Sequence, residues 1–219
     1  MLGFTTMNIK KFTCLLWILL LTNIAVAQRF SGGFYAGIIG SQIDGDQSAG
    51  YNKGGFNVAA TVQYPLSDKF FMSMDLGYAQ KGSQSKTSYG IPRALSIKIN
   101  YVDLPLCINF YDRQHVGFTA GLQYSRTVGA IKQDIIMLPN SSRVYGIDSF
   151  KKDDIEVILG GTYYINKTIN VNLRYGYSIV PMGYGKGSLY KNNAAFNNII
   201  QIRLGFILGQ EFDDVKGKN

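Results

Sequence analysis

Apolar and polar residues alternate along most of the chain after its first thirty residues. Between residues 56 and 64, Phe56, Val58 and Val62 alternate with Asn57 and Thr61. Successive side chains of a strand point to opposite faces, so this pattern predicts a strand with one apolar face and one polar or small face. The pattern recurs in eight segments: residues 33–43, 56–64, 70–79, 95–110, 116–125, 155–160, 169–177 and 200–208.

The longest of these segments, residues 95–110, changes phase near its middle. Up to Tyr101 the apolar residues are odd-numbered, and from Val102 onward they are even-numbered. One extra residue in a strand shifts the phase by one position, so the sequence predicts a β-bulge at Tyr101 and Val102. Pro105 has no N–H to donate, and we therefore expect irregular strand pairing near it.

The connections between the segments are alternately long and short. The long connections are residues 44–53, 82–93, 129–154 and 179–198, and the short ones are residues 65–69, 111–115 and 166–168. In an up-and-down meander, all the long connections lie at one end. Outer-membrane barrels of bacteria have this asymmetry. The sequence thus predicts an all-β fold: an eight-stranded antiparallel up-and-down transmembrane β-barrel with short periplasmic turns and long extracellular loops.

The two faces of the predicted strands differ in residue size as well as polarity. The apolar face carries large side chains, whereas the other face combines charged residues with glycine and alanine. A secreted soluble barrel would turn its apolar face inward, but small residues suit the crowded inside of a narrow barrel. Aromatic residues near both strand ends, such as Phe70, Phe110, Tyr78 and Tyr124, also favour a membrane barrel.

The predicted inward face carries a balanced set of six charged residues. They are Asp75, Lys98, Asp103, Glu156, Arg174 and Arg203. An eight-stranded barrel is just wide enough for its own side chains, and unpaired charges inside it would be costly. We therefore expect a barrel-interior charge network that fills the barrel. The alternative is a path for protons or solutes.

The N-terminus has the layout of a secretory signal peptide. Lys10 and Lys11 precede an apolar run, residues 12–21, and Ala25 and Ala27 form a small-residue cleavage site. The apolar run is too short for a transmembrane helix of about 20 residues. We expect residues 1–27 to be cleaved, residues 28–209 to form the barrel and residues 210–219 to form a polar tail; either Met1 or Met7 fits as the start. Together with the predicted transmembrane barrel, this export signal predicts a location in the cell outer membrane.

Composition and charge limit the partners. Charged residues make up 16% of the chain, and the formal net charge of +8 comes from scattered lysines and arginines. An exported chain does not routinely meet nucleic acid, so we expect contact with outer-membrane lipid instead. Cys107 is the only cysteine after the predicted signal peptide, and we expect it to be a small buried residue.

Catalytic and metal chemistry find little support in the sequence. His115, the only histidine, falls in a predicted short turn without a recognisable serine beside it. No His/Cys cluster suggests a metal site, and we expect no cofactor. The chain is therefore predicted not to be an enzyme.

The long loops contain apolar residues that are unusual in segments facing water, and exposed apolar clusters often mark interaction sites. These candidate partner-contact residues are Ile135, Ile136, Met137, Leu138, Tyr184, Tyr190 and Phe196. The stretch around Ile135 could extend the barrel wall, cover its mouth or meet a partner. The loops could equally fold onto one another as a cap.

Several stretches resemble the PorT-like branch of outer-membrane β-barrel proteins of Bacteroidetes. They are Gly33-Phe-Tyr-Ala-Gly37, Tyr64-Pro-Leu-Ser-Asp-Lys-Phe70, Leu76-Gly-Tyr-Ala-Gln-Lys-Gly82 and Asn100-Tyr-Val-Asp-Leu-Pro-Leu106. The last is similar to the family's strand motif, with Asp103 at its acidic position. The resemblance covers most of the chain after the predicted signal peptide and implies a fold and a location. The family is named for a component needed for type IX protein secretion.

Three functions are compatible with the sequence. The first is a non-enzymatic outer-membrane barrel with a structural or interaction role in the envelope, linked through the resemblance to type IX secretion and to partners in the envelope or secretion machinery. The second is a small passive porin-like or ligand-binding barrel. The third is a membrane-embedded lipid-modifying enzyme. The sequence names no ligand.

Overall fold

The computed structural model describes ten strands, the first beginning at Ser31 and the last ending at Leu208. The described residues are 30–45, 50–85, 93–112, 115–129, 132–137, 141–146, 150–182 and 195–209, so the predicted signal peptide and polar tail lie outside them. Within these ranges no helix is long and apolar enough to cross a bilayer. The strands are β1 (Ser31–Asp44), β2 (Lys53–Pro65), β3 (Phe70–Gln84), β4 (Arg93–Asp112), β5 (Val116–Thr127), β6 (Lys132–Met137), β7 (Ser141–Gly146), β8 (Asp153–Tyr164), β9 (Ile169–Ser178) and β10 (Phe196–Leu208).

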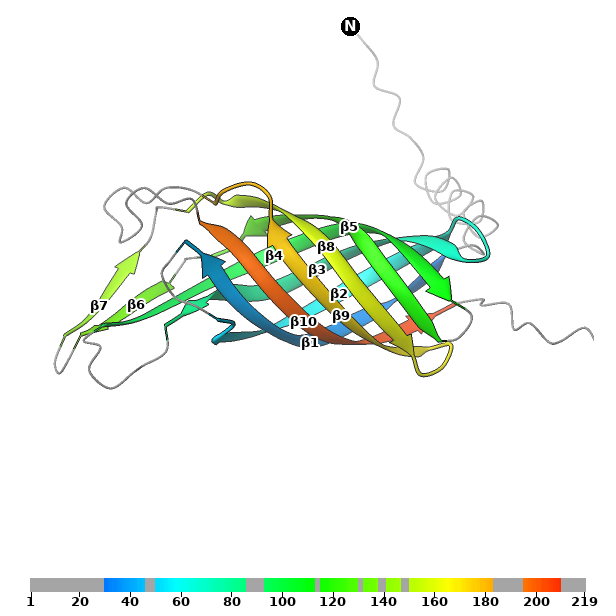
Figure 1. The fold of residues 1–219 in the computed structure, drawn as a ribbon, viewed down its shortest axis with the longest axis horizontal. Coiled ribbons are helices and arrows are strands. Elements are labelled where there is room, and N and C mark those ends of the chain that lie inside the picture. Colours follow the sequence, from blue (N-terminus) through cyan, green and yellow to red (C-terminus); the bar gives the residue numbers. More distant parts are fainter. Residues whose placement is uncertain are drawn as a thin grey trace, which may run out of the picture. The chain divides into compact units, whose positions relative to one another are not determined.

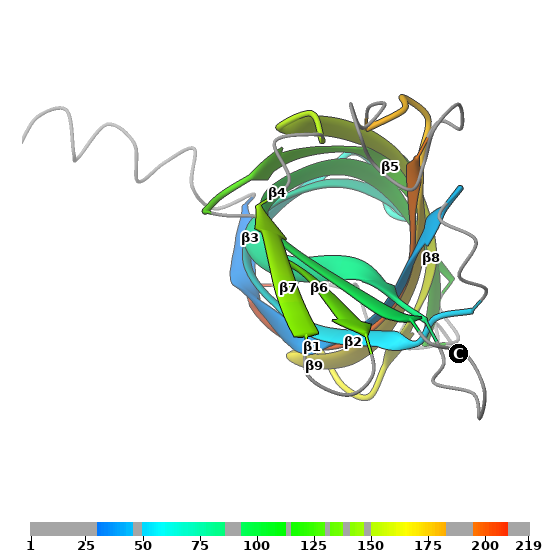
Figure 2. The same cartoon turned by 90° about the vertical axis from the view of Figure 1, so that its left-hand side faces the viewer.

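Eight of these strands close into an antiparallel barrel, which confirms the predicted fold. The ring runs β1-β2-β3-β4-β5-β8-β9-β10 and returns to β1. The closing pair, β1 with β10, is in register from Gly32 opposite Leu208 to Asp44 opposite Phe196. Figure 1 shows the strands tilted around the barrel, and Figure 2 shows the ring from the end that carries β6 and β7.

Short connections join β2 to β3, β4 to β5 and β8 to β9 at one end of the barrel. Side chains that favour turns shape two of them. In the turn before β9, the Asn166 Oδ1 accepts hydrogen bonds from the backbone N–H groups of Thr168 and Ile169, both at 2.8 Å. The Ser67 Oγ accepts from the Phe70 N–H at 3.2 Å in the turn before β3. These local contacts reverse the chain in a few residues, as the sequence predicted.

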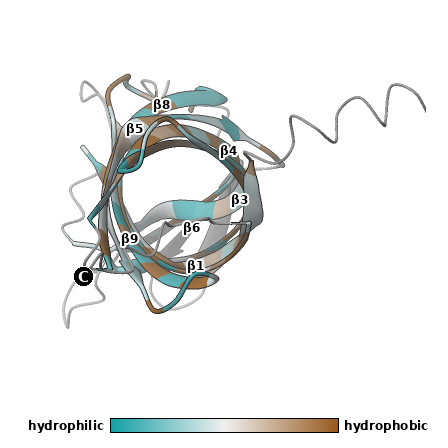
Figure 3. Ribbon diagram, turned by 90° about the vertical axis from the view of Figure 1, so that its right-hand side faces the viewer, coloured by the Kyte–Doolittle hydropathy of each residue, from teal (hydrophilic) through white to brown (hydrophobic). Residues whose placement is uncertain are grey.

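Large apolar side chains cover the outside of the barrel. Phe34, Leu76, Phe118 and Leu204 each expose more than half of their surface. The residues between them on the same strands face inward and are mostly polar and buried, so hydropathy alternates along the strands in Figure 3. A surface of this kind suits hydrocarbon rather than water. Pairs of aromatic rings lie on the outer face toward both ends, with Phe70 against Phe110 and Phe56 against Tyr78.

The predicted β-bulge at Tyr101 and Val102 is wrong. The pairing of β3 with β4 keeps one register across these residues, with Tyr78 opposite Val102 and Ala79 opposite Tyr101. The alternation of buried and outward residues in β4 is also uninterrupted. What changes is the barrel interior, which becomes apolar toward the long-loop end. The predicted irregularity near Pro105 is confirmed, because no partners pair between Met74–Leu106 and Gly77–Asp103.

The segment predicted as one long loop, residues 129–154, contains a hairpin of β6 and β7. The wall strand β5 pairs with β4 from Tyr101 to Asp112, and β6 pairs with the earlier part of β4, Arg93–Lys98. The hairpin therefore continues the sheet beyond the point where β5 has left it. In Figure 1 it projects from the long-loop end of the barrel. Of the three roles considered for this stretch, the backbone matches an extension of the wall.

Candidate functional site

Two groups of buried charged residues occupy the barrel interior. The group nearer the long loops is centred on Lys81 of β3. Its Nζ lies 3.2 Å from an Asp103 carboxylate oxygen and 2.5 Å from a Glu156 carboxylate oxygen. The same ammonium donates to the Ser125 Oγ at 3.1 Å and lies 4.8 Å from the centre of the Tyr101 ring. One cation thus joins four neighbouring strands of the barrel, β3, β4, β5 and β8.

The second group is centred on Asp75, which lies six residues earlier in β3. Its Oδ2 accepts hydrogen bonds from the Nη1 atoms of Arg174 at 3.0 Å and Arg203 at 3.1 Å. Arg203 also donates to the Asn172 Oδ1 and lies 4.2 Å from the centre of the Tyr35 ring. All five side chains are buried. This group connects β3 with β1, β9 and β10 on the other side of the barrel.

The structure places five of the six predicted interior charges inside the barrel and corrects the sixth. Lys98 lies on the outward face of β4, in phase with exposed Leu104 and Leu106, so its assignment to the interior is wrong. The cause is the apolar interior near the long loops, which makes residues 95–101 present an apolar inner face. Lys81 supplies the interior cation instead.

Asp154 is a further buried charge that the sequence analysis missed. Its Oδ2 accepts hydrogen bonds from the Ser178 Oγ and the Asn197 Nδ2, both at 2.8 Å. The described interior therefore holds four acidic residues and three basic ones, in place of the predicted three of each. A signal for both missed residues existed in the sequence, because Lys81 is in phase with Asp75, and Asp154 is in phase with Glu156.

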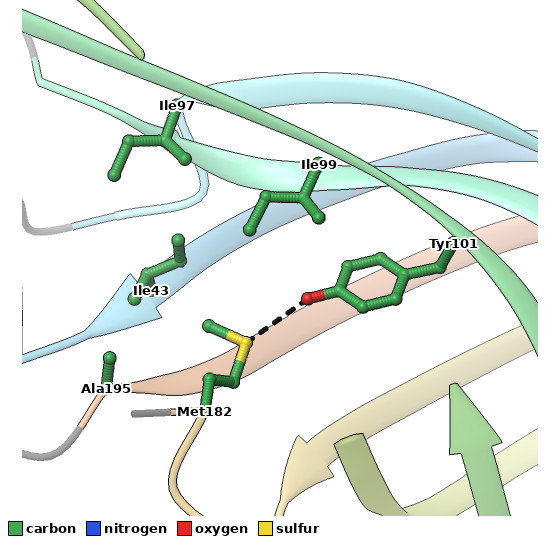
Figure 4. Packing of buried hydrophobic residues seen from close by; sticks show 6 residues of the cluster. All are labelled: Ile43, Ile97, Ile99, Tyr101, Met182 and Ala195. Carbon is green, nitrogen blue, oxygen red and sulfur yellow. Dashed lines mark hydrogen bonds between the residues drawn. The ribbon is translucent and has the colours of Figure 1, made fainter. Parts of the chain in front are cut away.

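An apolar cluster lies above the Lys81 group, toward the long loops. Its buried members are Ile43, Ile97, Ile99, Tyr101, Met182 and Ala195. Figure 4 shows these side chains converging from β1, β4 and the ends of the last long connection. The Tyr101 hydroxyl donates to the Met182 Sδ at 3.3 Å and accepts from the Asn197 Nδ2 at 3.2 Å. The cluster thus separates the interior charges from the long-loop end.

Polar residues fill the interior toward the short turns. The Asn109 side chain donates to the Ser73 Oγ at 2.8 Å and accepts from the Thr119 Oγ1 at 2.7 Å. Tyr164 packs edge-on against Tyr111, with ring centres 5.0 Å apart. Between the two charged groups, a cavity lined by Asp75, Asp103 and Arg203 among others has a volume of only about 10 Å³, room for a single water molecule. The described charged side chains around this cavity are therefore closely packed.

The structure also describes His115 and Cys107. His115 is an exposed turn residue before β5 with a φ of 72°, a left-handed conformation in which histidine is several-fold enriched. Cys107 is a free, buried cysteine, as predicted. No group of three or more metal-ligating residues occurs among the described residues.

The candidate partner-contact residues lie partly within the described ranges. Ile135, Ile136 and Met137 fall in β6, and Phe196 begins β10, where its ring stacks on Tyr177 at 6.0 Å. Leu138, Tyr184 and Tyr190 lie outside the described residues. Phe196 is therefore part of the barrel wall.

Three solved structures illustrate the similarity of this barrel to known ones. The attachment invasion locus protein Ail of Yersinia pestis is 12% identical, with a TM-score of 0.51 over 81% of this chain and 98% of that chain. Neisserial surface protein A is 12% identical, with a TM-score of 0.45 over 81% and 96%. The outer membrane protein OprG of Pseudomonas aeruginosa is 15% identical, with a TM-score of 0.40 over 82% and 94%. At such identities, the match to Ail shows a shared fold.

Curated protein sequences give no significant match to the chain. A family model, described as an outer membrane protein beta-barrel domain, matches residues 25–182, which is well over half of the chain. The closed barrel, its apolar outer wall and its polar interior agree with that match. The chain therefore belongs to the family of outer membrane protein beta-barrel domains, and this membership implies a location in the outer membrane.

Proposed function

We propose that this protein is a non-enzymatic, closed outer-membrane barrel that acts through partners bound at its long-loop end. The observation that carries the proposal is the filled interior. Lys81 joins Asp103 and Glu156, Asp75 joins two arginines, and the apolar cluster lies above both groups. A barrel of eight strands has little room beyond its own side chains, so this packing argues against a passive pore.

The hairpin of β6 and β7 supports a role in binding. It adds two strands beyond the barrel wall, and β7 pairs only with β6 among the described strands. An edge strand offers backbone N–H and C=O groups to a further strand, which is a common mode of protein association. Ile135, Ile136 and Met137 on β6 add apolar residues to the same segment.

A partner in the secretion machinery is the most specific form of this proposal. It rests on the PorT-like stretches, in particular Asn100-Tyr-Val-Asp-Leu-Pro-Leu106 with Asp103 in the motif. In this barrel Asp103 is an interior residue that contacts Lys81. The motif therefore stabilises the barrel here, and we assign the binding role to the hairpin at the long-loop end.

Affinity isolation after gentle detergent extraction tests the proposal. The full chain should retain stable partner proteins, and replacing residues 130–149 with a short glycine-serine linker should release them while the barrel remains folded. Phe150 is kept because it packs against the interior apolar cluster. Arg126→Ala is the control, because Arg126 lies exposed at the same end in an ion pair with Asp153. Recovery of the barrel alone together with defined ion conductance would contradict the proposal in favour of a pore. Lipid turnover that disappears with His115→Ala would contradict it in favour of an enzyme.

A further inference from the structure

The outer wall carries an apolar groove that the proposed function does not use. It crosses the wall from the β9–β10 side over β1 and β2 to β3 and β4, with a volume of about 770 Å³. Ala36 and Ala60, small outward-facing residues on neighbouring strands, line its middle. The larger side chains of Phe34, Leu76 and Leu204 stand around them, each more than half exposed. The groove therefore arises where short side chains interrupt a wall of long ones.

Its dimensions match one lipid chain. Adjacent strands lie about 4.8 Å apart, so a groove spanning β10 to β4 extends over roughly 19 Å. That distance is comparable to the roughly 15 Å depth of one leaflet, half of a hydrocarbon core about 30 Å thick. The volume of about 770 Å³ also falls within the roughly 300–1,000 Å³ usual for small-molecule sites. Since the family location puts this wall in the bilayer, hydrocarbon is the medium that meets the groove.

The outer face changes from apolar to basic between the groove and the long-loop end. Tyr78 and Val102 pair at the edge of the groove, Gln80 and Asn100 form the next outward pair, and Lys98 follows opposite Gly82. The Gln80 Nε2 donates to the Tyr78 hydroxyl at 3.3 Å, which orients an amide at this boundary. A membrane lipid presents the same order of chemistry from its acyl chain through its ester linkage to an anionic headgroup. Lys98 lies four residues beyond Val102, a distance of about 13 Å along the strand.

We propose that the groove binds one acyl chain of an anionic membrane lipid whose headgroup contacts Lys98. The site needs only the outer-membrane location of the barrel and does not depend on partner proteins at the hairpin. In this proposal, Lys98 on the outside of the barrel binds the anionic headgroup of the lipid. The same geometry predicts that the lipid is held in the leaflet on the long-loop side, because Lys98 lies at that end of the wall.

Native mass spectrometry of the folded barrel tests the proposal. The full-length protein is reconstituted with phosphatidylglycerol or with phosphatidylcholine of the same acyl chains, and the lipid that remains bound is measured during stepwise activation in the gas phase. We expect one retained lipid, with phosphatidylglycerol retained to higher activation energy than phosphatidylcholine. Ala60→Phe, which fills the middle of the groove, should lose the lipid of either headgroup. Lys98→Gln should abolish the preference for phosphatidylglycerol and leave retention of phosphatidylcholine unchanged.

Ala120→Phe is the matched control, because Ala120 is an outward alanine on β5 that does not line the groove. It should retain lipid as the unmodified chain does, and unchanged heat-modifiable gel mobility should show that each variant is folded. Absence of a retained lipid, or equal retention by Ala60→Phe and Ala120→Phe, would overturn the proposal. So would a dimer of the unmodified chain that Ala60→Phe dissociates, since a second copy would then cover the groove. Failure of partner isolation would leave these measurements unaffected.

Discussion

Replacing Lys81 with methionine should strongly destabilise the barrel. Methionine has a similar length but carries no charge, so the substitution removes one buried cation without opening a large cavity. It leaves Asp103 and Glu156 buried, with side-chain exposures of 9% and 0%, and without their shared counter-ion. The Ser125 hydroxyl loses a donor at 3.1 Å as well.

The magnitude follows from the burial of the pair. Removing one partner of a buried ion pair typically costs about 3–5 kcal/mol, because the remaining charge is desolvated and uncompensated. Arg126→Met provides the comparison at a solvent-exposed pair. The Arg126 and Asp153 side chains are 57% and 50% exposed and lie 2.9 Å apart. Exposed pairs contribute only about 0.2–1 kcal/mol, so this control should change stability little.

Urea titration of the barrel folded into phosphatidylcholine vesicles, followed by far-ultraviolet circular dichroism, gives the free energy of unfolding for each variant. Combining Lys81→Met with Glu156→Gln should recover part of the loss, since the second substitution removes one of the two uncompensated carboxylates. A cost for Lys81→Met no larger than that for Arg126→Met would contradict a stabilising buried ion pair. So would a double variant with Glu156→Gln that is less stable than Lys81→Met alone.

Three further outcomes are expected from the same structure. Arg174→Ala should lower the temperature at which the barrel loses its folded gel mobility, because Asp75 then keeps only one of its two arginine partners. Currents across planar bilayers should stay at background for this variant. A large rise in current would speak against a filled interior. Leu122→Arg, on the outer face midway along β5, should cost about 2–4 kcal/mol of unfolding free energy in vesicles, and a negligible change would be inconsistent with a lipid-facing wall. Gly121→Val should cost about 1–3 kcal/mol in the same titration, because even its Cβ would overlap the Leu106 carbonyl oxygen and lie 2.7 Å from the Cys107 Cα on the paired strand. An unchanged midpoint would show that the strands can separate there.

The sequence predicted the barrel well because two simple signals agree. Alternation with a period of two identifies each wall strand, and short polar connections mark where the chain reverses. Thus β2 ends at Pro65 and β3 begins at Phe70, as the predicted turn at residues 65–69 requires. The large residues on one phase and the small or charged residues on the other also assigned the outer and inner faces of most strands.

The interior network could be predicted only in part. Alternation shows which residues share a face, but it cannot show which face points inward where the inner face becomes apolar and the outer face polar. That reversal misplaced Lys98 and produced the false bulge, since Ile97 and Ile99 are apolar and face inward. Lys81 and Asp154 lay just beyond the segments used for the pattern, although their phase was correct. Pairing across the barrel, such as Lys81 with Glu156, depends on the register of strands far apart in the chain.

The hairpin of β6 and β7 shows another limit. Its strands are six residues each, and their sequences, Lys132–Met137 and Ser141–Gly146, lack a clear alternation of large apolar and polar residues. The hairpin is joined to the barrel by the pairing of β6 with Arg93–Lys98 of β4, a contact between parts of the chain about forty residues apart. Local sequence patterns do not contain such information.

Ion conductance of the unmodified protein in planar lipid bilayers shows whether the barrel is closed and filled by its own charged and apolar side chains. We expect background current at all applied voltages at which the bilayer is stable, with folding verified by heat-modifiable gel mobility of the same protein. Discrete, reproducible current steps from the folded, unmodified protein would contradict a closed, filled barrel, because they would require a continuous aqueous path past Lys81 and Asp75.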